Sequence, residues 1–208
     1  MGNALIRTLK KGGLSMFRNK RVESSDTELN VLLTFLQQKY ASQLAEIERH
    51  FPIKWYIESN CYRIWAPSTT LAFTHLGDQQ LSICFLLHNI KKEIHTKHNI
   101  TDKTLLKHVT ECFVEFLFLH ELKHMYQFCE GLTLKDYKKK GSYKSNPFEV
   151  QANQFALETI KDEDPFRYNL LHFLIDDGKI NHTNEQEWQL NLLKREKKFD
   201  PIVSNQTF

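Results

Sequence analysis

The sequence predicts an α+β fold, with a small, mostly antiparallel sheet in the first half of the chain and a helical part in the second half. Apolar residues recur at helical spacing up to about residue 49, and short runs rich in β-branched and aromatic residues follow between residues 53 and 90. Helical patterns return after residue 101. The chain has 208 residues, of which 41% are hydrophobic and 25% charged, so it can bury the core of one domain.

The first predicted helix spans residues 26 to 49. Ser25 and Glu28 have the spacing of a capping box, in which each side chain accepts a hydrogen bond from a backbone N–H at the helix start. Apolar residues then recur on one face, and Pro52 ends the pattern. Residues 1–24, ahead of this helix, form a predicted basic arm, because six Lys and Arg interrupt their apolar residues before residue 22.

The predicted strands follow as four short runs, "IKWYI", "CYRIWA", "TLAFTHL" and "LSICFLLH". They are separated by "ESN", "PST" and "GDQQ", which are typical of turns. We therefore expect three or four strands. The last run leads into "NIKKEIHTKHN", which we expect to be a solvated, lysine-rich loop.

The second half of the chain is predicted to be helical. One helix is expected from about residue 102 to 130, capped by Thr101 or Asp102 and ended by Gly131. Its centre, "CFVEFLFLHEL", is apolar nearly all round, which is typical of a central, buried helix. Pro147 is expected to open the next helix at its first turn. Further helices are expected at about 165–176 and 183–197.

Composition and charge limit the possible classes of protein. We expect one domain over residues 25–200, followed by an irregular tail over 201–208. The net charge of +3 is too small to indicate a nucleic-acid site, and no apolar run is long enough to predict a transmembrane segment. The four cysteines form no CxxC pair, and the apolar content is sufficient for folding without disulfides. We therefore expect reduced thiols and a cytoplasmic location.

The stretch "FLHELKHMYQF", residues 118–128, carries the candidate chemistry. His120 and His124 are four residues apart, so a helix places their imidazoles on one face, at the spacing of two zinc ligands. Glu121 is turned by about 100° from His120 and is placed to accept a proton from a metal-bound water, as a general base does. The alternative is a core helix whose histidines are satisfied by other side chains, but burying three titratable residues without partners would cost several kcal/mol.

A third ligand is expected from the helix that Pro147 opens. Glu149 lies in its first turn, and Asn153 lies one turn further along the same face. Glu149 could complete a set of three protein ligands, which leaves the fourth position open for water. Asn153 could then hold a ligand histidine through the ring nitrogen that does not face the metal. The alternative for Glu149 is a glutamate favoured only by the helix dipole.

These residues resemble a known family. The stretch His120–His124 with the downstream "EVQANQFA" is similar to the gluzincin clan of HExxH metallopeptidases, most of all to the ImmA/IrrE group and the small minigluzincins. The resemblance implies a zincin-like fold, with His120, His124 and Glu149 as zinc ligands and Glu121 as the base. It also implies a protein or peptide substrate. Its specific part covers residues 120–156.

One residue departs from the family pattern. The clan usually has small or uncharged residues between the two histidines, whereas this chain has Lys123. We expect the Lys123 ammonium to reach solvent or to pair with a nearby carboxylate, such as that of Glu115 or Glu130.

The donor that would stabilise an oxyanion is expected in the loop between the two ligand helices. Tyr143 is the candidate, and Tyr137 lies in the same loop. Arg167 and His172 are alternatives further along the chain.

The function expected from these observations is that of a zinc metallopeptidase, an enzyme that hydrolyses a peptide bond through a metal-activated water. An extended peptide substrate could pair with the edge of the sheet, for which we expect "LSICFLLH" to be the edge strand. The alternative is a non-catalytic zinc-binding or regulatory protein on the same scaffold. No pattern in the sequence indicates an oligomeric state.

We predict that the basic arm is dispensable for folding, because it has no strong period and contains Gly12 and Gly13. A variant that begins at residue 23 should melt within a few degrees of the full chain in a thermal unfolding experiment. A large drop in melting temperature would show instead that the arm packs into the core.

Overall fold

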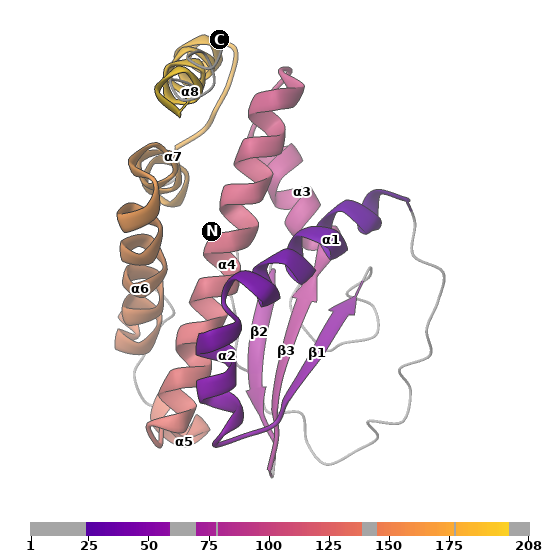
Figure 1. Ribbon diagram of the computed structural model, residues 1–208, viewed down its shortest axis with the longest axis vertical. Coiled ribbons are helices and arrows are strands. Elements are labelled where there is room, and N and C mark those ends of the chain that lie inside the picture. The colour runs from indigo at the N-terminus through magenta and orange to yellow at the C-terminus, as the bar shows by residue number, and fades with distance from the viewer. Residues whose placement is uncertain (1–23, 59–69, 78, 139–144, 177, 200–208) are drawn as a thin grey trace, which may run out of the picture.

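The structure is a computed structural model that describes residues 24–58, 70–77, 79–138, 145–176 and 178–199. A three-stranded sheet lies on one side of a long central helix, and two helices lie on its other side (Figure 1). The elements are α1 (Ser24–Lys39), α2 (Ala41–Glu48), β1 (Ile53–Glu58), β2 (Ala72–Leu76), β3 (Leu81–Leu86), α3 (Leu87–Lys97), α4 (Lys103–Cys129), α5 (Leu134–Lys138), α6 (Pro147–Glu163), α7 (Pro165–Ile175) and α8 (Glu185–Phe199). The α+β class is therefore confirmed. The predicted tail, and the predicted arm apart from Ser24, lie outside the described residues.

The first predicted helix is divided into α1 and α2, which run in different directions (Figure 1). The division falls at Tyr40, whose backbone has φ −104° and ψ 25°. Helical hydrogen bonds continue through this residue, because its N–H donates to the Leu36 carbonyl and its own carbonyl accepts from Leu44. The change of direction accompanies a tertiary contact: the Tyr40 hydroxyl donates to the buried carboxylate of Glu115 on α4, at 2.6 Å.

The sheet is mixed, so the prediction of a mostly antiparallel sheet is wrong. Its order is β1-β3-β2, with β3 parallel to β1 and antiparallel to β2. The prediction that "LSICFLLH" is an edge strand is also wrong, because β3 lies between the other two described strands. Every residue of β3 except Ser82 is buried, as in a central strand covered on both faces. The predicted strand "CYRIWA" lies outside the described residues.

The segment after β3 forms the helix α3, where a solvated loop was expected. Leu87, Ile90 and Ile94 recur at helical spacing and are buried, whereas Lys92 and His95 are exposed. The abundance of lysines concealed this amphipathic pattern.

His98, expected in the same loop, is buried at the C-terminal end of α3. Its Nδ1 accepts a hydrogen bond from the backbone N–H of Ile180, at 3.3 Å. Burial, together with the neighbouring charges of Lys97 and Lys179, lowers the pKa of His98 to about 4, so the ring is neutral at pH 7. His98 is therefore part of the packing between α3 and the segment before α8.

The four long helices of the second half agree with the prediction, whereas the short helix α5, which carries Tyr137, lies in a segment that was expected to be a loop. Asp102 caps α4 by accepting from the N–H of Leu105 at 2.7 Å, and Gly131, at φ +94°, follows its C-terminal end. Pro147 lies in the first turn of α6, after the cap Asn146. Helices α7 and α8 begin and end within two residues of the expected positions. None of the described helices is long and apolar enough to cross a membrane.

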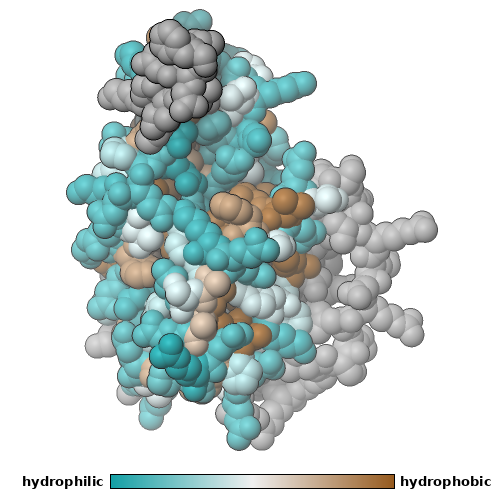
Figure 2. Space-filling view, viewed as in Figure 1, coloured by the Kyte–Doolittle hydropathy of each residue, from teal (hydrophilic) through white to brown (hydrophobic). Residues whose placement is uncertain are grey.

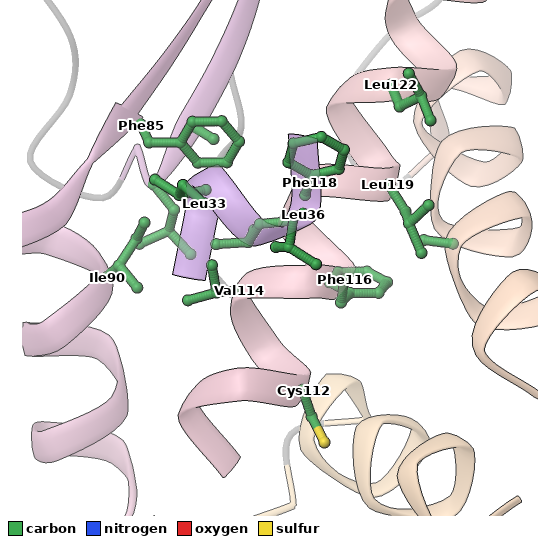
Figure 3. Close-up of a cluster of buried hydrophobic side chains, with 14 of the residues drawn as sticks. Leu33, Leu36, Phe85, Ile90, Cys112, Val114, Phe116, Phe118, Leu119 and Leu122 are labelled. Atoms are coloured by element: carbon green, nitrogen blue, oxygen red, sulfur yellow. The ribbon is translucent and has the colours of Figure 1, made fainter. Parts of the chain in front are cut away.

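The core is built around α4 (Figure 3). The ring of Phe118 on α4 stacks with those of Tyr40, Trp55 and Phe85, at centroid distances of 5.7, 5.6 and 6.3 Å. One central ring thus joins α4 to the first helical region and to two strands of the sheet. This packing fixes α4 against the sheet and so positions the residues on its other faces.

A buried charged cluster joins α4 to the first and seventh helices. Glu115, which is 2% exposed, lies 2.7 Å from the Lys39 ammonium, accepts from Tyr40, and is paired with Arg167. Burial alone would raise the pKa of Glu115, but the charges of Arg167 and Lys39 outweigh it and hold that pKa below its usual value. The carboxylate is therefore ionised and fully paired.

We predict that Glu115→Gln destabilises the protein by about 2–4 kcal/mol, because it leaves a partly buried Arg167 without its counter-charge. Denaturant unfolding would measure the loss. The matched control is Glu111→Gln on the same helix, whose side chain is 38% exposed and lies 3.9 Å from Lys107. The control should cost less than about 0.5 kcal/mol. Equal losses in the two variants would contradict the structural role of the cluster.

Candidate metal centre

Three predicted ligands converge at one point between α4 and α6. The ligand atoms of His120, His124 and Glu149 all lie within 4.8 Å of one another, and the group is buried. The two Nε2 atoms are 3.0 Å apart, and they lie 3.2 Å (His120) and 3.3 Å (His124) from the carboxylate oxygens of Glu149. This buried group could hold a metal ion.

The local structure explains why the three side chains meet. Residues four apart on α4 lie on one face, which brings the two imidazoles together. On the other helix, Asn146 caps the start of α6 by accepting from the N–H of Phe148 at 3.1 Å. This cap places Glu149 in the first turn, and α6 packs along α4. A glutamate is favoured at that position by the helix dipole as well.

The distances and the chemistry of the three groups fit a divalent ion such as zinc. Two nitrogen ligands of a tetrahedral zinc ion lie about 3.3 Å apart, and the two Nε2 atoms are 3.0 Å apart. Oε2 of Glu149 is fully buried, and among the described residues it has no hydrogen-bond partner of good geometry. A buried carboxylate oxygen that faces a ring nitrogen without a hydrogen bond is the arrangement that a cation would satisfy.

The pKa shifts of Glu149 and His124 also fit a site for a cation. Burial would raise the pKa of Glu149, but contacts with His120 and His124 outweigh it and hold that pKa well below its usual value. Burial would lower the pKa of His124, but Glu149 beside it raises that pKa above the usual 6.5. Glu149 therefore stays ionised and favours positive charge at the point where the three side chains meet.

Each ligand histidine has its second ring nitrogen occupied by a side-chain oxygen. Nδ1 of His120 lies 2.9 Å from Oδ1 of Asn153, which is the contact that the sequence spacing predicted. Nδ1 of His124 lies 2.8 Å from Oε1 of Gln127. Gln127 was not among the predicted site residues. Its position three residues after His124, on the same face of the helix, was the available signal.

Glu121 is buried beside the cluster but is not part of it. The Thr74 hydroxyl on β2 donates to Oε2 of Glu121 at 2.8 Å, whereas Oε1 has no hydrogen-bond partner among the described residues. Burial raises the pKa of Glu121, although the nearby His124 and His120 act in the opposite direction. One carboxylate oxygen is thus held and the other is free to accept a proton.

Tyr137 is the only candidate oxyanion donor that the described residues place near the ligands. Its hydroxyl donates to Oε1 of Glu149, and burial, together with the charge of Glu149, raises the pKa of Tyr137 far above its usual value. Tyr143 lies outside the described residues. The two alternatives do not contact the three predicted ligands: Arg167 pairs with Glu115, and His172 is exposed and pairs with Asp176.

Lys123 does not enter the cluster. Its ammonium lies 3.6 Å from Oε1 of Glu130, one of the two expected partners, while Glu115 pairs with other cations.

A hollow of about 470 Å³ lies along α1, beside its exposed side chains Val31 and Phe35. Apolar surface is visible on the face that carries α1 (Figure 2). That hollow is lined by residues of α1 and not by the three ligands.

Comparisons with known proteins add no further constraint. No protein-family model, no curated protein and no solved structure matches this chain. The function of this chain is therefore inferred from its sequence and from the geometry of the candidate metal centre.

Proposed function

We propose that the protein is a zinc-dependent metallopeptidase, with His120, His124 and Glu149 as the zinc ligands and Glu121 as the general base. The observation that carries the proposal is the convergence of three buried ligand atoms within 4.8 Å, next to a buried glutamate outside the ligand set. Metal centres that hydrolyse peptide bonds use such a set, with three protein ligands and a separate carboxylate.

The roles of the residues follow from their contacts. A bound zinc ion would polarise the scissile carbonyl and lower the pKa of a bound water. Glu121 would accept the proton at Oε1, the oxygen without a partner among the described residues, while Thr74 holds Oε2 at 2.8 Å. The raised pKa of Glu121 suits this role, because the protonated carboxyl can then pass its proton to the leaving amine.

The proposed fold family is the zincin-like one of the gluzincins. The supporting features are the order of a helical region, a small sheet, the HExxH helix and a helix that carries the glutamate ligand. An extended peptide would pair with β2, which has only β3 as a partner among the described strands and contacts Glu121 through Thr74. β2 thus replaces β3 as the proposed substrate-binding strand.

The alternative function is a zinc protein without catalysis. It is favoured by burial, since the ligands and Glu121 are each at most 1% exposed. A structural zinc site is closed in this way, whereas a catalytic one keeps a position open for water and substrate. The two functions share the ligands and differ in whether Glu121 is needed.

We predict one zinc ion per chain, with an affinity that rises with pH. Below its raised pKa, His124 carries a proton that zinc must displace, so affinity should increase from pH 5.5 upward and level off above that pKa. The lowered pKa of Glu149 keeps its carboxylate ionised throughout this range, so it should add nothing to the slope. Competition with a chromophoric chelator at constant ionic strength would measure the affinity.

His120→Ala and Glu149→Ala should lose most of the zinc, whereas the control His172→Ala should retain it, because His172 is exposed and pairs with Asp176. Wild-type protein that has never met a chelator and still takes up no zinc would refute the metal centre.

Glu121→Gln separates the two functions. The variant should keep its zinc and its stability, because glutamine has a similar shape and Glu121 is not a ligand. It should lose peptide hydrolysis by several orders of magnitude, because an amide cannot accept the proton of the attacking water. Mass spectrometry of an unbiased peptide library would identify cleavage, with Glu111→Gln as the control that keeps full activity. Cleavage by Glu121→Gln at the wild-type rate would refute the assigned base, and a zinc-loaded wild type that cleaves nothing would favour the alternative.

A further inference from the structure

We infer that Gln127 is a positioning residue that sets the ring tautomer of His124 and ties this ligand to the helix that carries Glu149. The inference rests on the proposed metal centre. Gln127 lies one turn after His124 on α4, and its side-chain amide is buried at 2% exposure. A buried amide is costly unless its donors and its acceptor are used, and this one has partners on both sides.

The hydrogen bonds of Gln127 fix which way the amide points. Its Nε2 lies 3.1 Å from the backbone carbonyl of Phe148 and 3.3 Å from Oε1 of Gln151. A backbone carbonyl can only accept, so the atom that faces it must be the amide nitrogen. The amide oxygen therefore faces Nδ1 of His124, at 2.8 Å.

The orientation of the amide determines the state of the histidine. An amide oxygen can only accept, so Nδ1 of His124 must carry a proton. In the neutral ring Nε2 then has a free lone pair, and Nε2 is the atom that faces His120 and Glu149. The Phe148 carbonyl thus orients the amide of Gln127, and this amide in turn favours the tautomer of His124 that can bind a metal.

The amide of Gln127 also links α4 to α6 next to two of the proposed ligands, His124 and Glu149. Phe148 directly precedes Glu149, so a bond from Gln127 to the Phe148 carbonyl restrains the backbone next to the third ligand. Asn153 has a different role, because it reaches from α6 to the ring of His120. Gln127 and Asn153 thus connect the two ligand helices in opposite directions, and each holds one histidine.

The test compares three variants in the full chain. Gln127→Met keeps a similar length and removes both the acceptor and the donor. Gln127→Glu keeps an acceptor for His124 and loses the donor to Phe148. The control is Gln154→Met on α6, whose exposed amide bonds to Glu158. Two quantities are measured: zinc affinity by chelator competition, and the tautomer of His124 by long-range ¹⁵N NMR of the metal-free protein at a pH at which the ring is neutral.

Wild-type His124 should be protonated on Nδ1. In Gln127→Met this preference should be lost and zinc affinity should fall by roughly 10–100-fold, the usual cost of removing a group that holds a metal ligand. Gln127→Glu should keep the Nδ1 proton and recover most of the affinity, which a role in helix packing alone does not predict. Gln154→Met should match the wild type in both measurements.

The inference is overturned if wild-type His124 is protonated on Nε2, or if Gln127→Met binds zinc as tightly as wild type. Should Gln127→Met fail to fold, Gln127→Glu decides, and an Nε2 proton or a 100-fold loss of affinity there would overturn the inference. Because the tautomer is measured without metal, it tests Gln127 even if the wild type binds no zinc. A wild-type protein that binds no zinc would refute the proposed metal centre but not the effect of Gln127 on the tautomer of His124.

Discussion

A helix that is apolar on nearly every face must be covered on nearly every face, and α4 places this requirement on the rest of the chain. Helices α1 and α2 and the sheet cover one side of α4, and α6 and α7 cover the other. Phe118 is fully buried at the centre of this packing. The polar side chains in the buried central part of α4, such as those of Glu115, His120 and Glu121, are therefore removed from water, and each of them needs a partner from a neighbouring element.

The two polar groups on α4 meet this need in different ways. Glu115 is neutralised by cations that reach it from α1 and α7, and its pKa is lowered as a result. The histidines and Glu149 have no lysine or arginine among their ion-pair partners in the described part of the chain. Positive charge at the second group must come from a proton or from a bound cation. The first group stabilises the fold without any ligand, whereas the second could hold a metal ion.

The sequence was sufficient to predict that His120, His124 and Glu149 lie together, because helical spacing alone brings the two histidines together and Pro147 marks the start of the helix that presents Glu149. The contact between Asn153 and His120 followed from the same reasoning. Gln127 was missed because a glutamine on a helix is usually solvated, and only the packing of α6 shows that its amide has partners on two elements. The helix α3 was missed because its lysines concealed the apolar face. The position of β3 in the sheet was missed because strand order depends on long-range pairing, which local patterns do not encode.

The strand order has a consequence for the sequence of folding events. β2 and β3 are close in the sequence, and the N–H of Gly77 donates to the carbonyl of Gln80 at 2.9 Å beyond their paired residues, so they can pair as a local hairpin. β1 pairs in parallel with β3, with Ile53 opposite Leu81, and this pairing requires closure of a much longer loop. Non-local pairing of this kind is slow compared with hairpin formation. The hairpin that carries Thr74 can thus form early, and the later arrival of β1 pairs the second edge of β3, the central one of the three described strands.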